Sequence, residues 1–290
     1  MARFTNQATL SYSGGVTTSN VVTGEVVAAF SAGKTAVTEQ YAPGETVTYV
    51  VSIQNPGDSP LEGVSVSDDL GEYQAEGVAV YPLEYAEGSL LYYLDGVLQP
   101  RPAVDAPLEI SGLTIPAGSS AMLIYETRVT EYAPLGPDAS VTNTAVITAQ
   151  SAACTAEASA TVPALSQVRL TVSKSLCPQE IPCSGEVTYT FRILNTGAAE
   201  AGPEESIVLA DAFDPVLTGL TAALNGAVQP AQSFYTYDPV SGQFETVPGA
   251  ITVPAASFVQ NQDGTWTTEP GETVVTVTGR IGGENEEIIE

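Results

Sequence analysis

Apolar and polar residues alternate along many short runs of the chain, and Val and Thr dominate these runs. Successive side chains of a β-strand point to opposite faces, so this period of two predicts strands with one buried face. Sequences rich in Gly, Pro and Asn separate the runs, as expected of antiparallel strands joined by short turns. The clearest alternation is found in residues 45–55, 63–68, 121–129, 140–148, 186–195 and 272–281.

No segment shows the period of an amphipathic helix, so the chain is expected to be all-β. Many short strands at this spacing are typical of immunoglobulin-like β-sandwiches. The Cys…Trp…Cys order of antibody domains is missing, because the single tryptophan, Trp266, follows all three cysteines.

An internal repeat divides the sequence into two similar bodies. The run around Lys34, GKTAVTEQYAPGETVTYVVSIQNPG, matches the run around Lys174, SKSLCPQEIPCSGEVTYTFRILNTG. Asp68 in the segment VSVSD then corresponds to Asp211 in IVLADAF. The length of 290 residues suits two domains, each large enough to bury its own core.

The two bodies differ at their ends. The first body continues after Val129 into residues 141–162, VTNTAVITAQSAACTAEASATV, whereas no such closing hairpin follows Ile281. A similar run, FTNQATLSYSGGVTTSNVVTGEVV, occupies residues 4–27, ahead of the first body. The predicted organisation is a donor hairpin over residues 1–28, a first sandwich over residues 29–166 and an incomplete second sandwich over residues 167–290.

Charge and composition exclude several classes of function. The chain has 34 acidic and 8 basic residues, and a net charge of -26 argues against binding to nucleic acid or to an anionic membrane. Histidine is absent, which removes the commonest general base and zinc ligand. We therefore expect no metal, no cofactor and no turnover enzyme. No apolar run is long enough for a membrane span, and no signal peptide is visible at the amino terminus.

The sequence resembles the conserved surface-protein repeat of Gram-positive bacteria and archaea. The resemblance lies in four motifs, which occur in the order KTA, PGETVTYVVSIQN, VSVSD and TNTAVIT. This repeat is a domain family of unknown function, and the resemblance covers most of residues 30–165 and, more weakly, residues 168–285. It implies β-sandwich modules of cell-surface and appendage proteins, as in clostridial spore appendages. The expected location is therefore extracellular, on a bacterial cell or spore surface.

Lys34, Asp68 and Asn143 are candidates for an intramolecular isopeptide bond in the first body. Burial would lower the pKa of the lysine and free its lone pair to attack the Asn143 carboxamide. Burial would also favour the neutral form of Asp68, which polarises the amide. Asp68 is preferred over the adjacent Asp69 because it aligns with Asp211. The alternative is that Lys34 is solvated and that Asn143 is a turn or edge residue.

The second body contains the remaining lysine of the chain, Lys174, together with Asp211, but no matching asparagine follows Ile281. Asn6 in the TNQA run is the candidate partner, donated by a neighbouring subunit through strand addition at an exposed sheet edge. A head-to-tail contact that does not close produces a filament. The alternatives are that residues 4–27 pack on their own chain or form a disordered leader.

The cysteines offer a second kind of crosslink. Cys177 and Cys183 are disulfide candidates six residues apart, and Cys154 remains as a free thiol or an intermolecular bridge; three reduced thiols are the alternative.

We therefore expect a structural fibre subunit whose partner is itself, with no nucleic acid and no membrane insertion. The competing classes are a monomeric adhesin or stalk module that binds a glycan or a host protein, and a secreted hydrolase.

Overall fold

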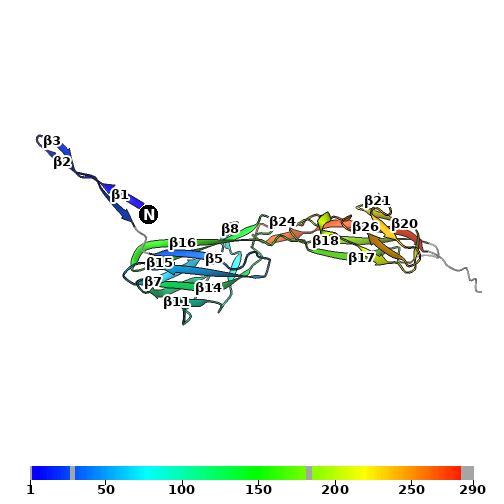
Figure 1. The fold of residues 1–290 in the computed structure, drawn as a ribbon, viewed down its shortest axis with the longest axis horizontal. Helices are drawn as coiled ribbons and strands as arrows, with labels where there is room; N and C mark the ends of the chain where they lie inside the picture. The colour runs from blue at the N-terminus through cyan, green and yellow to red at the C-terminus, as the bar shows by residue number, and fades with distance from the viewer. Residues whose placement is uncertain (1, 27–29, 181–184, 282–290) are drawn as a thin grey trace, which may run out of the picture. The chain divides into compact units, whose positions relative to one another are not determined.

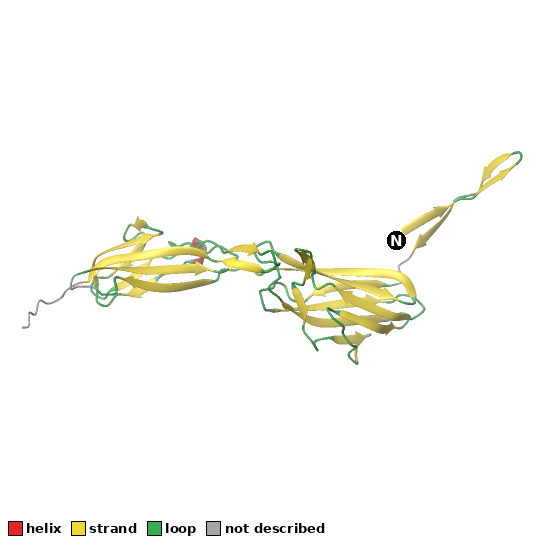
Figure 2. Cartoon of the chain, turned by 180° about the vertical axis from the view of Figure 1, so that it is seen from behind, coloured by secondary structure: helices red, strands yellow, loops and turns green. Residues whose placement is uncertain are grey.

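The computed structural model describes residues 2–26, 30–180 and 185–281. Within these ranges the chain consists of strands and loops with one short 3-10 turn, η1 (Pro203–Glu205), which confirms the expected all-β fold (Figure 2). All pairs between named strands are antiparallel. The chain forms two compact units, which are Met1–Ala133 with Ser140–Pro163, and Pro134–Ala139 with Ala164–Glu290. The finer division at residues 28 and 166 stays a prediction.

The first unit has two main sheets (Figure 1). One sheet contains, in spatial order, β12 (Val97–Gln99), β11 (Leu91–Leu94), β14 (Ser120–Val129), β6 (Thr46–Gln54) and β5 (Ser31–Ala36), and β10 (Leu83–Tyr85) also pairs with β14. The other sheet contains β13 (Glu109–Ile115), β7 (Leu61–Asp68), β15 (Ser140–Ala149) and β16 (Ala152–Pro163). A separate small hairpin is formed by β8 (Tyr73–Ala75) and β9 (Val78–Val80).

The core of the first unit lies between these sheets, because alternate residues of each strand are buried. In β6 the buried set is Val47, Tyr49, Val51 and Ile53. In β15 it is Val141, Asn143, Ala145, Ile147 and Ala149. The last strand, β16, also lies against the first strand, β5, so the β15–β16 hairpin closes this side of the unit (Figure 1).

The second unit repeats the first sheet but has a smaller second sheet. Its larger sheet contains β17 (Leu170–Cys177), β18 (Glu186–Asn195), β26 (Gly271–Ile281), β20 (Leu217–Leu224) and β21 (Ala227–Gln229). Its smaller sheet contains β19 (Ala210–Ala212), β23 (Gln243–Thr246) and β22 (Tyr235–Tyr237). A further hairpin is formed by β24 (Ser257–Gln260) and β25 (Trp266–Glu269).

Equivalent asparagines lie at the ends of equivalent strands, Asn55 directly after β6 and Asn195 as the last residue of β18, which supports the internal repeat. The Asn55 carboxamide donates to the carbonyl oxygens of Ile115 (3.0 Å) and Pro116 (2.9 Å). The Asn195 carboxamide likewise donates to the carbonyl oxygens of Ala199 (2.7 Å) and Pro254 (3.1 Å). Both buried side chains thereby hold neighbouring backbone carbonyl groups in place.

The amino-terminal segment forms a hairpin of its own. β1 (Ala2–Asn6) pairs with β4 (Val22–Val26), and β2 (Thr9–Tyr12) pairs with β3 (Gly15–Thr18). Among the described residues these four strands pair only with one another. More than half of the surface of several large apolar side chains is exposed here, namely Phe4, Leu10, Tyr12, Val16, Val21 and Val22.

Candidate crosslinking site

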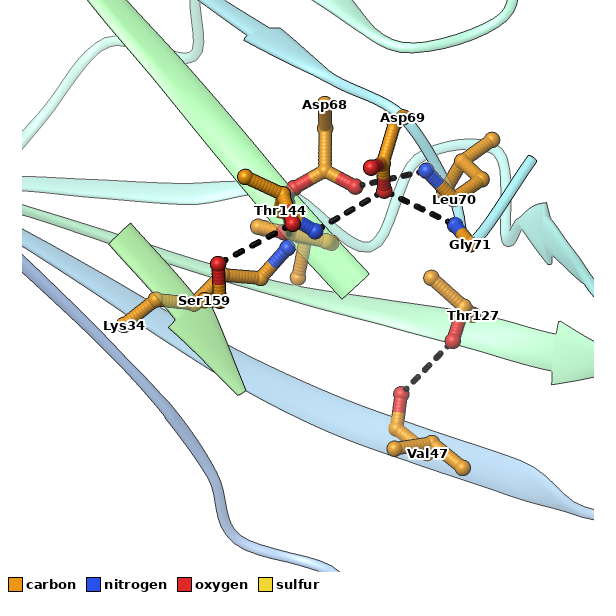
Figure 3. A network of polar contacts seen from close by, with 10 residues as sticks. Lys34, Val47, Asp68, Asp69, Leu70, Gly71, Thr127, Thr144 and Ser159 are labelled. Carbon is orange, nitrogen blue, oxygen red and sulfur yellow. Dashed lines mark hydrogen bonds and ion pairs between the residues drawn. The ribbon is translucent and has the colours of Figure 1, made fainter. Parts of the chain in front are cut away.

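Lys34 and Asp68 form an ion pair inside the first unit. β5 contributes Lys34 and the end of β7 contributes Asp68, so the two residues come from opposite sheets. The Lys34 Nζ lies 2.6 Å from Asp68 Oδ2, and both side chains are fully buried (0% exposed). Figure 3 shows the Lys34 side chain ending beside the Asp68 carboxylate. The structure thus brings together two of the three residues predicted for the first crosslink.

Two tyrosines surround this pair. The Lys34 Nζ lies 4.9 Å from the centre of the Tyr49 ring and 6.0 Å from that of Tyr125. The Tyr125 hydroxyl donates a hydrogen bond to Asp68 Oδ2, and the Leu70 backbone N–H donates to Asp68 Oδ1 at 3.1 Å. Both carboxylate oxygens therefore have fixed donors, which hold the carboxylate in one orientation.

Burial lowers the pKa of Lys34, because the charged ammonium loses its hydration inside the sandwich. The nearby Asp68 carboxylate opposes this effect by attracting the charge. The net lowering increases the share of neutral amine, which is the nucleophilic form of a lysine.

Asn143 is the third predicted residue, and it lies in the same cluster. Its side chain is completely buried, yet neither Nδ2 nor Oδ1 has a hydrogen-bond partner among the described residues. Asn143 faces the core from β15, two residues before Ala145, which lies opposite Asp68. Burial raises the pKa of Tyr49 and of Tyr125 in the same cluster. A buried amide without partners costs about 1–3 kcal/mol, so its presence in this cluster calls for an explanation.

Asp69 has a different role from Asp68. It points to the exposed face, where its Oδ1 accepts hydrogen bonds from the backbone N–H groups of Thr144 (2.8 Å) and Gly71 (2.9 Å). Its own N–H donates to the Thr144 carbonyl at 3.0 Å. These bonds tie the end of β7 to the residue that follows Asn143 (Figure 3), so they fix the strand that carries the carboxamide.

The second unit contains a similar but more open site. Lys174 and Asp211 form an ion pair, and their side chains are 41% and 19% exposed. The Lys174 Nζ lies 4.7 Å from the ring centre of Tyr189, 5.4 Å from that of Phe213 and 5.5 Å from that of Phe191. Aromatic rings therefore lie on one side of Lys174, but its other side is exposed to solvent, unlike that of Lys34.

In the first unit the β15–β16 hairpin encloses the lysine, and the described part of the second unit has no equivalent hairpin beside Lys174. In the first unit β7 pairs with β13 on one edge and with β15 on the other. In the second unit β19 pairs with β23, and no strand in the described part of the chain pairs with its other edge. On β17, Val172 is on the same face as Lys174 and is 60% exposed. Asn6, the predicted partner of Lys174, is exposed on β1 opposite Val22.

The sequence did not point to the two tyrosines of this candidate site. Tyr49 and Tyr189 occupy equivalent positions in the internal repeat, so the sequence alone could have indicated a tyrosine beside each lysine. Tyr125 lies opposite Tyr49 in the β6–β14 pair, whereas Val277 lies opposite Tyr189 in the β18–β26 pair. The second site therefore lacks the hydroxyl that binds the carboxylate in the first.

Tyr125→Phe is expected to slow crosslinking in the first unit by about ten- to hundredfold, because loss of the hydroxyl leaves the Asp68 carboxylate less well positioned. The rate is measured by the intact mass of newly synthesised chains, sampled over time after cell-free translation. Tyr93→Phe, a half-buried tyrosine of β11, is the matched control and should leave the rate unchanged. An unaltered or faster rate for Tyr125→Phe would show that Tyr125 only fills space.

The cysteine predictions remain untested. Cys154 is half-buried and Cys177 is exposed, and neither forms a disulfide among the described residues. Cys183 lies outside the described residues, so its pairing with Cys177 stays a prediction.

Comparisons with known proteins find only distant likeness. No protein-family model matches the chain, and no curated protein sequence is similar to it, so the resemblance to the surface-protein repeat stays a prediction. No helix in the described residues has the length and hydrophobicity needed to cross a membrane.

Several solved structures show a weak similarity. BcpA, the major pilin subunit of Bacillus cereus, matches 97% of this chain and 75% of its own length, at 14% identity and a TM-score of 0.36. The pilus backbone RrgB from Streptococcus pneumoniae matches 84% of this chain and 55% of its own, at 10% identity and a TM-score of 0.35. A family 123 glycoside hydrolase from Clostridium perfringens matches 48% of this chain and 28% of its own, at 14% identity and a TM-score of 0.30.

The chain thus spans about half the length of RrgB and just over a quarter of the hydrolase. With TM-scores this low the similarity is too distant to assign a function, which has to be argued from the residues of this chain.

Proposed function

We propose that the protein is a structural subunit of an extracellular bacterial fibre, which assembles head to tail by strand complementation and is stabilised by Lys–Asn isopeptide bonds. The observation that carries this proposal is the open edge of β19 beside Lys174 and Asp211, in a chain whose amino-terminal hairpin pairs with no other strand among the described residues. An uncovered edge with an apolar face is a site for strand addition.

The hairpin has the side chains that such a site requires. Aligning Asn6 with Asn143 places Phe4, Ala8, Leu10 and Tyr12 at the positions of four inward-facing residues of β15, which are Val141, Ala145, Ile147 and Ala149. Residues 4–24 include no charged side chain, although the whole chain has a net charge of -26. A hairpin without charge can approach an acidic unit without repulsion and can be buried there at low cost.

The contact of Lys34 with Asp68 and the burial of Asn143 support the proposed crosslink in the first unit. The neutral Lys34 amine attacks Cγ of Asn143, while Asp68 relays a proton to the departing nitrogen. The Cγ–Nδ2 bond breaks, one ammonia leaves and a Lys–Asn amide remains. No oxidant or cofactor is required, and each bond forms once, so there is no turnover. The reaction gives the buried Asn143 carboxamide a covalent partner in place of missing hydrogen bonds.

The same chemistry in the second unit needs a partner chain. Lys174 and Asp211 are already in contact, and Asn6 of a neighbouring subunit would supply the carboxamide. Docking of the hairpin would cover Lys174 and remove it from water, which favours the neutral amine. Each joint of the fibre would thereby become covalent.

Intact-mass analysis of the full chain under denaturing and reducing conditions tests the first crosslink. The expected result is a monomer mass lower by one ammonia than the sequence mass, and a full mass for Lys34→Ala. A wild-type monomer that retains the full sequence mass would contradict the proposed chemistry.

Lys174→Ala is expected to abolish covalent multimers and to leave non-covalent fibres, because the docked hairpin loses its crosslink and keeps its strand pairing. Denaturing gels and negative-stain microscopy measure the two properties separately. The matched control, Arg192→Ala, removes a different exposed cation of the same sheet and should retain the covalent ladder. A ladder that persists in Lys174→Ala would mean that another residue forms the joint.

A second candidate function is a monomeric surface adhesin or stalk module. The first unit has an open cavity of about 650 Å³ lined by Tyr81, Tyr85 and Tyr132 together with Glu84 and Asp105. Tyrosine rings and carboxylates are suited to stacking on, and hydrogen bonding with, a sugar. Multi-angle light scattering separates the two functions, since an adhesin of this kind stays monomeric at all concentrations.

A further inference from the structure

We infer that the donor strand enters the second unit of its neighbour in one defined register, with Ala8 opposite Asp211, Thr9 opposite Ala210 and Ser11 opposite Val208. This inference rests on the proposed function and specifies the joint between two copies of the chain. The first unit provides the template, because it contains both the acceptor strand and its closing strand.

The template register is set by the pairing of β15 with β7. In that pair Ala145 lies opposite Asp68, Val146 opposite Ser67 and Thr148 opposite Ser65. Asn143 therefore lies two residues before the alanine that faces the aspartate. The sequence TNQA places Asn6 two residues before Ala8 in the same way.

The acceptor positions transfer through the equivalence of Asp68 and Asp211. Lys34 lies opposite Val51 of β6, and Lys174 lies opposite Phe191 of β18, so the two lysine–aspartate pairs occupy matching places in their sheets. Counting back from Asp211 makes Ala210 equivalent to Ser67, and Val208 equivalent to Ser65. Ser67 is exposed in the first unit, and Ala210 is exposed in the second.

The apolar face of the donor strand and the position of Asn6 are together compatible with this register alone. A shift by one residue would turn Phe4, Asn6 and Leu10 to the solvent and bring Thr5 and Thr9 to the core. A shift by two residues would keep the apolar face inward but would move Asn6 by about 6.6 Å along the strand, away from Lys174. The requirement that Leu10 is buried and the requirement that Asn6 meets Lys174 are therefore met together in one register.

The register also accounts for the short length of β19. β7 has eight residues and is paired on both edges, whereas β19 has three and is paired on one. Pairing of Ser11 with Val208 would extend β19 towards its amino-terminal side, since an added strand supplies the hydrogen bonds that a regular strand needs.

Disulfide trapping between two single-cysteine chains tests the register. Cys154, Cys177 and Cys183 are first replaced by Ser, and Lys174→Ala is added so that any covalent dimer must be a disulfide. A chain with Thr9→Cys is mixed with a chain with Ala210→Cys and oxidised. Directly opposed residues of an antiparallel pair have Cα atoms about 4.5–5.5 Å apart, which suits a disulfide.

Gln7 and Ala212 complete a matched set of four mixtures. The register predicts reducible dimers for Thr9→Cys with Ala210→Cys and for Gln7→Cys with Ala212→Cys. It predicts at least tenfold less dimer for Thr9→Cys with Ala212→Cys and for Gln7→Cys with Ala210→Cys. Each single-cysteine variant is also oxidised alone, which measures how much disulfide dimer forms between two identical chains.

The outcomes separate the register from the proposed function. Polymers with the reverse pattern of dimers, or with equal dimer in all four mixtures, would overturn the register and leave the fibre intact. Loss of polymer in the cysteine-free parent with native Lys174 would overturn both. A Thr9→Cys, Ala210→Cys double variant that closes a disulfide within one monomer, while the mixtures give no dimer, would place the hairpin on its own chain and overturn the joint.

Discussion

Chains that lack residues 2–27 are expected to stay monomeric at concentrations at which the full chain polymerises. The deletion removes the hairpin that pairs only with itself among the described residues, and it leaves the two main sheets of each unit unchanged. The effect should be complete, because in the proposed joint this hairpin supplies both the added strand and the Asn6 carboxamide. Multi-angle light scattering over a range of concentrations measures the mass of the species.

A synthetic peptide of residues 1–27 provides the control for this deletion. It should bind the truncated chain and become attached to Lys174 with loss of one ammonia, because it supplies the missing strand and the Asn6 carboxamide. The same peptide with Asn6→Ala should bind without covalent attachment. Polymers formed by the truncated chain would show that the hairpin is not the donor.

Asn143→Ala is expected to lower the free energy of unfolding of the first unit by about 4–5 kcal/mol, because it removes a crosslink that closes a loop on the order of a hundred residues long. The substitution removes an amide that makes no hydrogen bond in the structure, so little of this effect should come from lost polar contacts. Chemical denaturation, together with intact mass, measures the loss and its cause.

Thr142→Ala, on the exposed face of the same strand, is the matched control. It should keep the ammonia-deficient mass and change the stability by less than about 1 kcal/mol. A stability of Asn143→Ala equal to that of the wild type, with each chain at its own full sequence mass, would contradict the proposed crosslink.

The sequence predicted most of the strands and the two lysine–aspartate pairs for specific physical reasons. Alternation of apolar and polar residues predicts a β-strand where the sequence shows no helical period. This pattern correctly predicted β6, β14, β15, β18 and β26. The internal repeat then related Lys34 to Lys174 and Asp68 to Asp211, because two copies of one fold place equivalent residues in equivalent contacts.

Other features could not be predicted, since they depend on pairing between distant strands. Tyr125 contacts Asp68 only because the register of β14 on β6 sets it opposite Tyr49, and no local pattern encodes that register. The segment IVLADAF resembles VSVSD, yet it forms a strand over three residues only. A strand on a sheet edge lacks the second neighbour that keeps a central strand extended, and sequence alignment does not show which neighbours are present.

The most direct test of the account uses two variants that cannot crosslink alone. Lys174→Ala, labelled with heavy nitrogen, keeps the donor hairpin, and unlabelled Asn6→Ala keeps the acceptor lysine. After mixing, we expect a denaturant-resistant dimer in which a heavy peptide with Asn6 is joined to a light peptide with Lys174, with loss of one ammonia. A mixture that contains only monomers under denaturing, reducing conditions would contradict it.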